Sequence, residues 1–278
     1  QLKTPSTAAV RALNTEYTAG EAKREEKTAK AVIMGGSFEV DRVLQNTSGA
    51  VDELAFQAQQ KIKATANYFH NLVINGTSAS SGTGYVVNTF DGLRKALTGT
   101  SNDFTTDIDL SDSTKMDSNA NAFVDQLDQL THMVDGGASL LLMNTAMLLK
   151  VRAAARRAGY YDRKKDDFGR AVEYFGDIPI MDAGMYYNGT KSVDVIDTST
   201  ASASAAGTSS IYAVNIALDG FHGISPTGTG VINSYMPNLK DPGAVKKGEV
   251  ELVAGVVLKN TLKAAALNGI ALKAKASV

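Results

Sequence analysis

The chain has 278 residues, with 28 lysines and arginines against 29 aspartates and glutamates and a formal net charge of −1. This balance argues against a dedicated nucleic-acid binder and against electrostatic attachment to a membrane, and no apolar run approaches the ~18 residues that span a bilayer. The absence of cysteine excludes disulfides and thiolate metal sites. At roughly 150 residues per domain, the length predicts one large or two small domains.

The start of the chain is polar and poorly patterned, and it cannot form a core by itself. We expect residues 1–30 to be an arm, ordered only where it lies on another surface. The next run, AVIMGGSFEVDRVL, holds two strand-like stretches, Ala31–Met34 and Phe38–Leu44, on either side of Gly35-Gly36. The pattern predicts a hairpin that turns at the glycines, projects from the body and pairs with another chain, because an isolated hairpin is marginal in water.

A long amphipathic helix is predicted over Val51–Val73, roughly 33 Å at ~1.5 Å per residue. Its apolar residues recur at spacings of three and four, on one helix face. They are Val51, Leu54, Ala55, Ala58, Ile62, Ala66, Phe69 and Val73. Asp52 and Glu53 suit the positive end of the helix dipole, and Asn75-Gly76 is a turn pattern just beyond the end.

The middle of the chain reads as a compact α/β unit. Ser118 or Asn119 can cap a helix that stops at Gly136-Gly137, and Ala138–Met143 has the continuous apolar pattern of a buried strand. A second helix, Thr145–Ala158, is predicted with Asn144 as its cap. A short helix is also predicted over Phe90–Leu97, and strands over Ala171–Phe175, Ile178–Met181, Val193–Asp197, Ile211–Leu218 and Glu249–Lys259. Asn268-Gly269, within Leu262–Leu272, predicts a second hairpin.

The search for catalytic motifs is negative. The three histidines form no zinc-binding pair, and neither a GxSxG elbow nor a phosphate-binding loop is present. Asp219, His222 and Ser225 lie within one turn, whereas a serine-hydrolase triad needs these groups on separate rigid elements. We therefore expect no enzyme activity and no cofactor.

Two stretches of the chain are rich in charge. Asp107, Asp109 and Asp112 offer oxygens to calcium, but the glycine and closing glutamate of a binding loop are missing, so a solvated acidic loop is favoured over a metal site. The run YYDRKKDDFGR mixes both signs, which suits salt-bridged contact between subunits as well as it suits a solvated loop. The candidate contact residues in this run are Arg163, Lys164, Lys165, Asp166 and Asp167.

Taken in order, these parts resemble the major capsid proteins of tailed double-stranded DNA phages, the Hong Kong 97-like family. GGSFEVDRVL (Gly35–Leu44) looks like the extended loop of that family, leading into its spine helix at Val51. Leu140–Tyr161 and Gly169–Gly184 look like its axial domain, and IYAVNIALDGFHGIS is similar to the strand and turn that follow. No single motif is specific, because the likeness lies in the ordered set.

The resemblance implies an α+β fold with four parts. They are an N-terminal arm (1–30), an extended loop with a hairpin (31–50), a peripheral domain with the spine helix (51–84 and 225–260) and an axial domain (85–224 and 261–278). It also implies that Phe38, Glu39, Asp41 and Arg42 of the extended loop contact a neighbouring subunit. In many relatives a maturation protease removes an N-terminal scaffolding segment. The resemblance therefore implies that Gln1 is a candidate processing terminus. Some relatives cross-link this loop through a lysine, which Ala31–Gln45 lacks.

The function implied is structural. Copies would form pentamers and hexamers that close into an icosahedral shell around double-stranded DNA, without sequence-specific binding and without a membrane. The expected partners are further copies of the chain and portal, scaffolding and decoration proteins, and the expected location is the virion, assembled in the host cytoplasm. The alternatives are an encapsulin-like nanocompartment shell protein, a secreted filament or surface-layer subunit, and, more distantly, an α/β enzyme with an unrecognised site.

Overall fold

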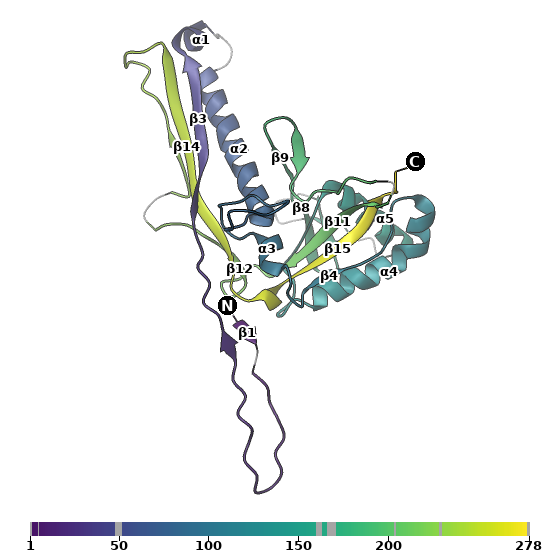
Figure 1. Ribbon diagram of the computed structural model, residues 1–278. Coiled ribbons are helices and arrows are strands. Elements are labelled where there is room, and N and C mark those ends of the chain that lie inside the picture. Colours follow the sequence, from purple (N-terminus) through teal and green to yellow (C-terminus); the bar gives the residue numbers. More distant parts are fainter. Residues whose placement is uncertain are drawn as a thin grey trace.

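The described chain consists of a body, a long projection and an arm that extends away from both (Figure 1). The computed structural model describes residues 2–4, 6–47, 52–159, 163–165, 171–202, 204–227 and 230–276. Helices and strands both contribute to the body and to the projection, which agrees with the predicted α+β class.

A mixed sheet forms the centre of the body. Its strands are β4 (Asp103–Thr105), β5 (Leu140–Met143), β6 (Arg163–Lys165), β7 (Ala171–Phe175), β8 (Ile178–Asp182), β11 (Gly207–Val214) and β15 (Ala264–Lys273). They lie in the order β4-β15-β11-β5-β8-β7-β6. β4 is parallel to β15 and β5 to β8, whereas the other neighbours are antiparallel. β11 and β5 lie near the middle of this order and carry buried apolar side chains, as the sequence predicts for β5.

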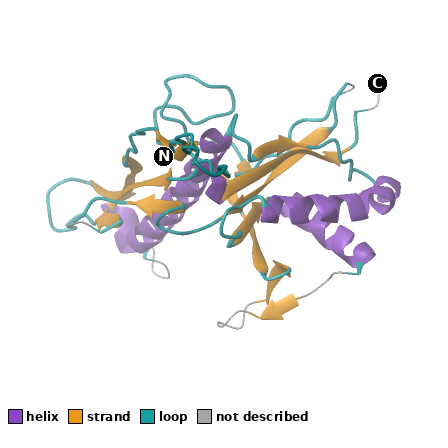
Figure 2. Ribbon diagram, turned by 90° about the horizontal axis from the view of Figure 1, so that it is seen from below, coloured by secondary structure: helices purple, strands orange, loops and turns teal. Residues whose placement is uncertain are grey.

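Both faces of this sheet are covered. Helices α4 (Ser113–His132) and α5 (Thr145–Ala158) pack on one face, as Figure 2 shows. Helix α3 (Leu93–Leu97) and the end of α2 (Glu53–Asn75) pack on the other. Successive β11 residues alternate between the two cores, because side chains of a strand point to opposite faces: Ile211 and Ala213 face α4 and α5, and Tyr212 and Val214 face α3.

The predicted hairpin at Asn268-Gly269 is wrong, because both residues lie inside β15. The pairing with β11 shifts opposite them, which makes the site a β-bulge. Gly269 has a φ of 84°, and a Cβ there would lie 2.5 Å from the carbonyl oxygen of Thr106. Because the bulge adds a residue, Leu267 before it and Ile270 after it both reach the core under α4 and α5.

The projection is a second sheet with α2 packed on one face (Figure 1). Its strands are β3 (Val32–Asp41), β12 (Phe221–Ile224), β13 (Ile232–Tyr235) and β14 (Val245–Leu258). β14 pairs antiparallel with each of the other three. Helix α2 confirms the predicted long helix, and the Asp52 carboxylate caps it by accepting the Ala55 N–H at 3.2 Å. The short helix α1 (Arg42–Thr47) follows β3 at the far end.

The hairpin turn predicted at Gly35-Gly36 is also wrong, because β3 is one continuous strand of 10 residues. All of them pair with β14, a strand far away in the sequence. The glycine serves close backbone approach: Gly35 has a φ of 155°, and a Cβ there would lie 1.9 Å from the carbonyl oxygen of Val250. The residues around Gly35-Gly36 do not reveal that their strand partner is β14. The glycine pair was therefore interpreted as a turn.

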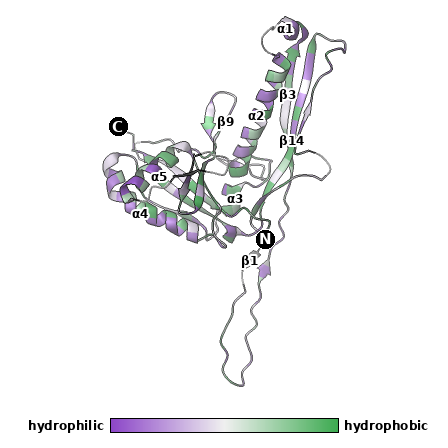
Figure 3. Cartoon of the chain, turned by 180° about the vertical axis from the view of Figure 1, so that it is seen from behind, coloured by the Kyte–Doolittle hydropathy of each residue, from purple (hydrophilic) through white to green (hydrophobic). Residues whose placement is uncertain are grey.

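The two helices of the body show how capping fixes helix ends. The predicted α5 is confirmed, since the Asn144 side chain accepts the Met147 N–H at 2.8 Å and Gly159 ends the helix with a φ of 77°. Helix α4 begins earlier than predicted, because Asp112 rather than Ser118 or Asn119 is its cap. Both helices carry hydrophobic and hydrophilic colours along their length in Figure 3, as amphipathic helices do.

The remaining elements are short. β1 (Leu2–Thr4) and β2 (Lys23–Arg24) pair antiparallel at the base of the arm. β9 (Met185–Tyr187) and β10 (Ser192–Asp194) form a small hairpin, here called the finger, and Thr261–Lys263 forms a 3₁₀ turn between β14 and β15. The strand predicted over Val193–Asp197 corresponds to β10, which begins one residue earlier and ends at Asp194.

Candidate assembly surfaces

The N-terminal arm (residues 1–30) runs out from the body and returns, with a turn at Leu13-Asn14 (Figure 1). Every described side chain from residue 6 to residue 30 is exposed. Apolar side chains are included, since Val10 and Leu13 are 101% and 90% exposed. The contacts near the tip are local, such as the Arg11 guanidinium 5.4 Å from the centre of the Tyr17 ring. The described residues of the chain do not bury the described side chains between residues 6 and 30, so the arm presents a long exposed surface.

The sequence pattern did not indicate that the arm exposes apolar side chains. Val10, Leu13 and Tyr17 are scattered among polar residues and show neither helical nor strand periodicity. A pattern search treats such residues as parts of a disordered segment. The sequence indicates this exposed surface only through the presence of large apolar residues in a segment that cannot form a core by itself.

The outer face of the projection carries two of the predicted contact residues. Glu39 and Asp41 alternate with buried Val40 and point away from α2. Lys247 of β14 lies directly opposite Glu39 in the register. Arg42 begins α1 and is exposed. These three predicted side chains are thus available to a neighbouring molecule, and their contact role stays a prediction.

Phe38 is placed differently. Its side chain is 6% exposed and packs with Val40, Val250 and Ala58 of α2 in the core of the projection. A Cβ on Gly248 would lie 2.3 Å from the Phe38 ring, so the ring rests on bare backbone. Phe38 supports its own subunit and does not present its side chain to another one.

The charged run of the body lies at a sheet edge. Arg163, Lys164 and Lys165 form β6, which pairs with β7 as the last strand of the sheet. Asp166, Asp167 and the candidate processing terminus Gln1 lie outside the described residues. The edge position is compatible with contact between subunits, and that role stays a prediction.

The finger is a surface that the sequence did not indicate. Met185 and Tyr187 are 51% and 63% exposed, on the opposite side from Tyr186, which packs toward the core around α3. Met181 at the foot of the finger is 52% exposed. β8 and β9 thus each carry exposed apolar or aromatic side chains. No strand was predicted over Met185–Tyr187, so no sequence pattern indicated this exposed side.

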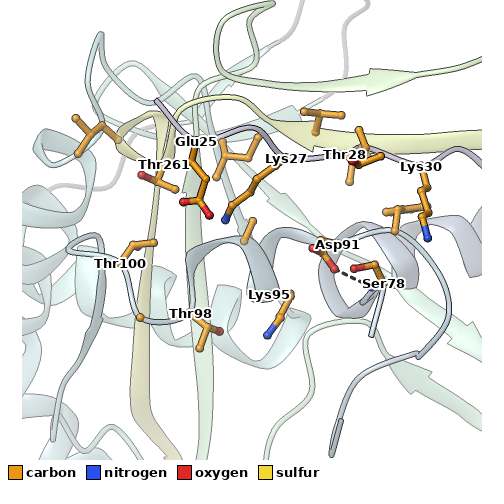
Figure 4. A pocket seen from close by; sticks show the side chains of 18 of the residues that line it. Glu25, Lys27, Thr28, Lys30, Ser78, Asp91, Lys95, Thr98, Thr100 and Thr261 are labelled. Atoms are coloured by element: carbon orange, nitrogen blue, oxygen red, sulfur yellow. Dashed lines mark hydrogen bonds between the residues drawn. The ribbon is translucent and has the colours of Figure 1, made fainter. Parts of the chain in front are cut away.

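A groove lies between the base of the arm and α3, and we call it the arm groove (Figure 4). Its volume is about 720 Å³. Residues 25–30 of the arm form one wall, α3 and the turn after it form another, and the end of β14 closes the inner side. Asp91 on this lining accepts the Ser78 N–H at 2.7 Å. The end of the arm lies close to β14, since a Cβ on Gly255 would lie 2.5 Å from the carbonyl oxygen of Lys30.

The residues considered for catalysis are engaged separately. Asp219 binds Lys263 at 3.3 Å, and this hydrogen bond lowers the pKa of the carboxyl. The Ser225 hydroxyl donates to the carbonyl oxygen of Val253, at 3.0 Å. His222 lies on β12 with its Nδ1 buried and without a hydrogen-bond partner among the described residues. The structure does not bring the three groups into a triad.

The acidic stretch is likewise accounted for by local structure. Asp109 binds Lys115 at 2.5 Å, and Asp112 caps α4. Burial favours a higher pKa for Asp109, but its hydrogen bonds with Lys115 and Ser111 outweigh burial and lower that pKa. Within the described ranges, no group of histidine, aspartate and glutamate side chains could hold a metal ion. No helix in those ranges is long and apolar enough to cross a membrane.

Comparison with known proteins gives a clear result at the level of structure. A chain of the capsid of Myoviridae phage XM1 matches with a TM-score of 0.54 at 14% identity, over 97% of this chain and 84% of that one. A chain from Mycobacterium phage Ogopogo matches with a TM-score of 0.55 at 12% identity, over 98% and 85%. The chain has the Hong Kong 97-like capsid fold.

An encapsulin chain is also similar to this chain in structure. A chain of the holo-SrpI encapsulin complex of Synechococcus elongatus PCC 7942 matches with a TM-score of 0.65 at 13% identity, over 93% of this chain and 81% of that one. No protein-family model matches the sequence, and no curated protein matches it. The likeness is therefore one of architecture, as the ordered set of predicted elements implied.

Proposed function

We propose that this chain is a major capsid protein that assembles through pentamers and hexamers into an icosahedral shell around packaged double-stranded DNA. The observation that carries the proposal is an exposed N-terminal arm on a chain with the Hong Kong 97-like capsid fold. Every described side chain from Ser6 to Lys30 is exposed, so the order of the arm depends on another surface. In a shell made of identical copies, the neighbouring subunit supplies that surface.

The other free surfaces support the same proposal. The outer face of the projection, the finger and the edge strand β6 lie on different parts of the molecule, so one subunit can contact several neighbours. Individually weak contacts allow errors to be corrected, and their number makes a closed shell durable. We assign the chain a structural role without catalysis, in the virion, with assembly in the host cytoplasm.

Further partners belong to the proposal. Portal, scaffolding and decoration proteins would complete the shell. DNA would be contained without sequence-specific contacts, and the net charge of −1 supports this, because a strongly basic shell would hold the genome tightly.

An encapsulin-like nanocompartment is the second candidate, and the likeness to the SrpI encapsulin chain favours it. Analytical ultracentrifugation of the purified full chain tests what the two candidates share. We expect capsomer-sized species that convert to particles of many subunits as the protein concentration rises. A stable monomer at every concentration and salt condition would contradict both candidates.

A further inference from the structure

Three Asn-Gly pairs in the chain place the same reactive groups next to one another. They are Asn75-Gly76, Asn188-Gly189 and Asn268-Gly269. In such a pair the backbone nitrogen of the glycine can attack the side-chain carbonyl carbon of the asparagine, because glycine has no Cβ to shield that nitrogen. The dipeptide is the same in all three places, so the fold decides which pair reacts.

Two of the pairs are held by hydrogen bonds within the body and the spine helix. The Asn75 amide donates to the Val195 carbonyl oxygen at 2.7 Å, and the N–H of Gly76 donates to a carbonyl oxygen in the last turn of α2 at 2.9 Å. In β15 the Asn268 amide donates to the Asp103 carboxylate, also at 2.7 Å. The glycine nitrogen cannot swing onto the asparagine side chain in either pair unless buried or part-buried hydrogen bonds break.

The third pair lies at the tip of the finger, where both residues are exposed. Oδ1 of Asn188 accepts the N–H groups of Thr190 and Lys191, each at 3.0 Å. Two donors at this oxygen stabilise the negative charge that develops on it when a nucleophile adds to the carbonyl carbon, as in an oxyanion hole. A Cβ on Gly189 would have no heavy atom within 4 Å, so neighbouring atoms do not hold the turn in place.

We propose that Asn188 is a site of spontaneous deamidation. Hydroxide takes the proton from the Gly189 N–H, the nitrogen bonds to the side-chain carbon of Asn188, and the bond from that carbon to Nδ2 breaks with release of ammonia. Water then opens the cyclic imide at either of its carbonyl groups, which leaves aspartate or isoaspartate. In the net change the chain gains water, loses ammonia and acquires a carboxylate.

The modification makes the charge of the finger depend on the age of the molecule. Older copies carry an added negative charge beside the exposed side chains of Met185 and Tyr187. Copies that contain isoaspartate also have a longer backbone in the turn. The proposal goes beyond the shell function and does not depend on it, because the reacting groups belong to neighbouring residues of a single chain.

Peptide mapping by mass spectrometry tests the proposal on the purified full chain after incubation at mildly alkaline pH. We expect the amide-to-acid mass change at Asn188, at a rate that rises in proportion to the hydroxide concentration. Asn75 and Asn268 should convert more slowly by about tenfold or more, because they react only after local opening of their elements. An isoaspartyl methyltransferase with S-adenosylmethionine should label the finger peptide of the aged chain, and Asn188→Ala should abolish that label.

The same chain unfolded in guanidinium chloride is the matched control. There the three pairs should convert at similar rates, because only the local sequence remains. The proposal is overturned if Asn188 stays unmodified in the folded chain, or if the three asparagines convert equally fast in the folded chain.

Discussion

Asn144 connects three elements of the body through one buried side chain. Its oxygen caps α5 at the Met147 N–H, and its nitrogen donates to the Ile196 carbonyl oxygen at 2.8 Å and to the Ser209 hydroxyl at 3.1 Å. The residue is 1% exposed, so water cannot replace these bonds. A polar side chain in this position specifies how α5, the segment after the finger and β11 meet.

Substitution of this residue should be costly. Asn144→Ala removes a cap worth about 1 kcal/mol and leaves buried groups unpaired at about 1–3 kcal/mol, so we expect a loss of about 2–4 kcal/mol in the free energy of unfolding. Urea titration of unassembled subunits measures it. Asn188→Ala, at the exposed tip of the finger, should change the midpoint little. Equal midpoints for the two variants would show that the buried network contributes no stability.

Tyr212 makes the free energy of unfolding depend on pH in the alkaline range. Burial raises the pKa of its hydroxyl from 10.0 to about 12. The folded state thus keeps a proton that the unfolded state loses, so the stabilisation is complete below pH 10 and is lost as the pH rises toward 12.

The expected slope is a fall of up to about 1.4 kcal/mol per pH unit in this window. Urea midpoints measured against pH should fall more steeply for the unmodified chain than for Tyr212→Phe. Tyr187→Phe, which alters an exposed tyrosine, should retain the steep slope. Parallel curves for the unmodified chain and Tyr212→Phe would contradict the role given to burial.

At the scale of elements, the effect of a substitution in β3 on the stability of the subunit depends on which face of the strand carries the residue. Phe38→Ala should destabilise the subunit by about 3–5 kcal/mol, because a large side chain leaves the core formed with α2 and β14. Glu39→Ala, on the opposite face, should stay within about 0.5 kcal/mol of the unmodified chain. Denaturation of unassembled subunits gives both values. A stable Phe38→Ala variant that fails only in assembly would restore Phe38 to the subunit interface.

Sequence patterns predicted the helices better than the strand connections. The periodicity of α2 and the Asn144 cap of α5 are local properties, and the structure confirms them. Gly35-Gly36 in β3 and Asn268-Gly269 in β15 were interpreted as turns, because Gly-Gly and Asn-Gly favour turns when nothing else is known. Their actual role is set by backbone that lies far away in the sequence, at Val250 and Thr106, which a local pattern does not contain.

The candidate contact residues show the same difference between what local sequence indicates and what tertiary structure decides. Phe38, Glu39 and Asp41 were assigned to a subunit contact by resemblance, without regard to the face of the strand that each occupies. The structure places Glu39 and Asp41 on the exposed face of β3 and Phe38 on the face that β14 and α2 cover, and the contact role itself stays a prediction. The finger and the arm groove depend on tertiary placement and had no sequence pattern.

At the scale of the whole molecule, the N-terminal arm should matter to assembly and not to the fold. Removal of residues 6–22 takes away exposed side chains and no described core residue, so the thermal stability of the subunit should change little. Particle formation should fall strongly, because the contacts that the arm makes with a neighbour are lost. A variant that assembles like the full chain would remove the arm from the proposed contacts, and one that unfolds would show that the arm supports its own subunit.

The shell itself is the central claim, and electron microscopy of the purified full chain tests it most directly. We expect closed icosahedral particles with pentamers and hexamers, and their diameter should distinguish a phage-sized head from a small nanocompartment. Monomers or small dimers under all assembly conditions would contradict the claim.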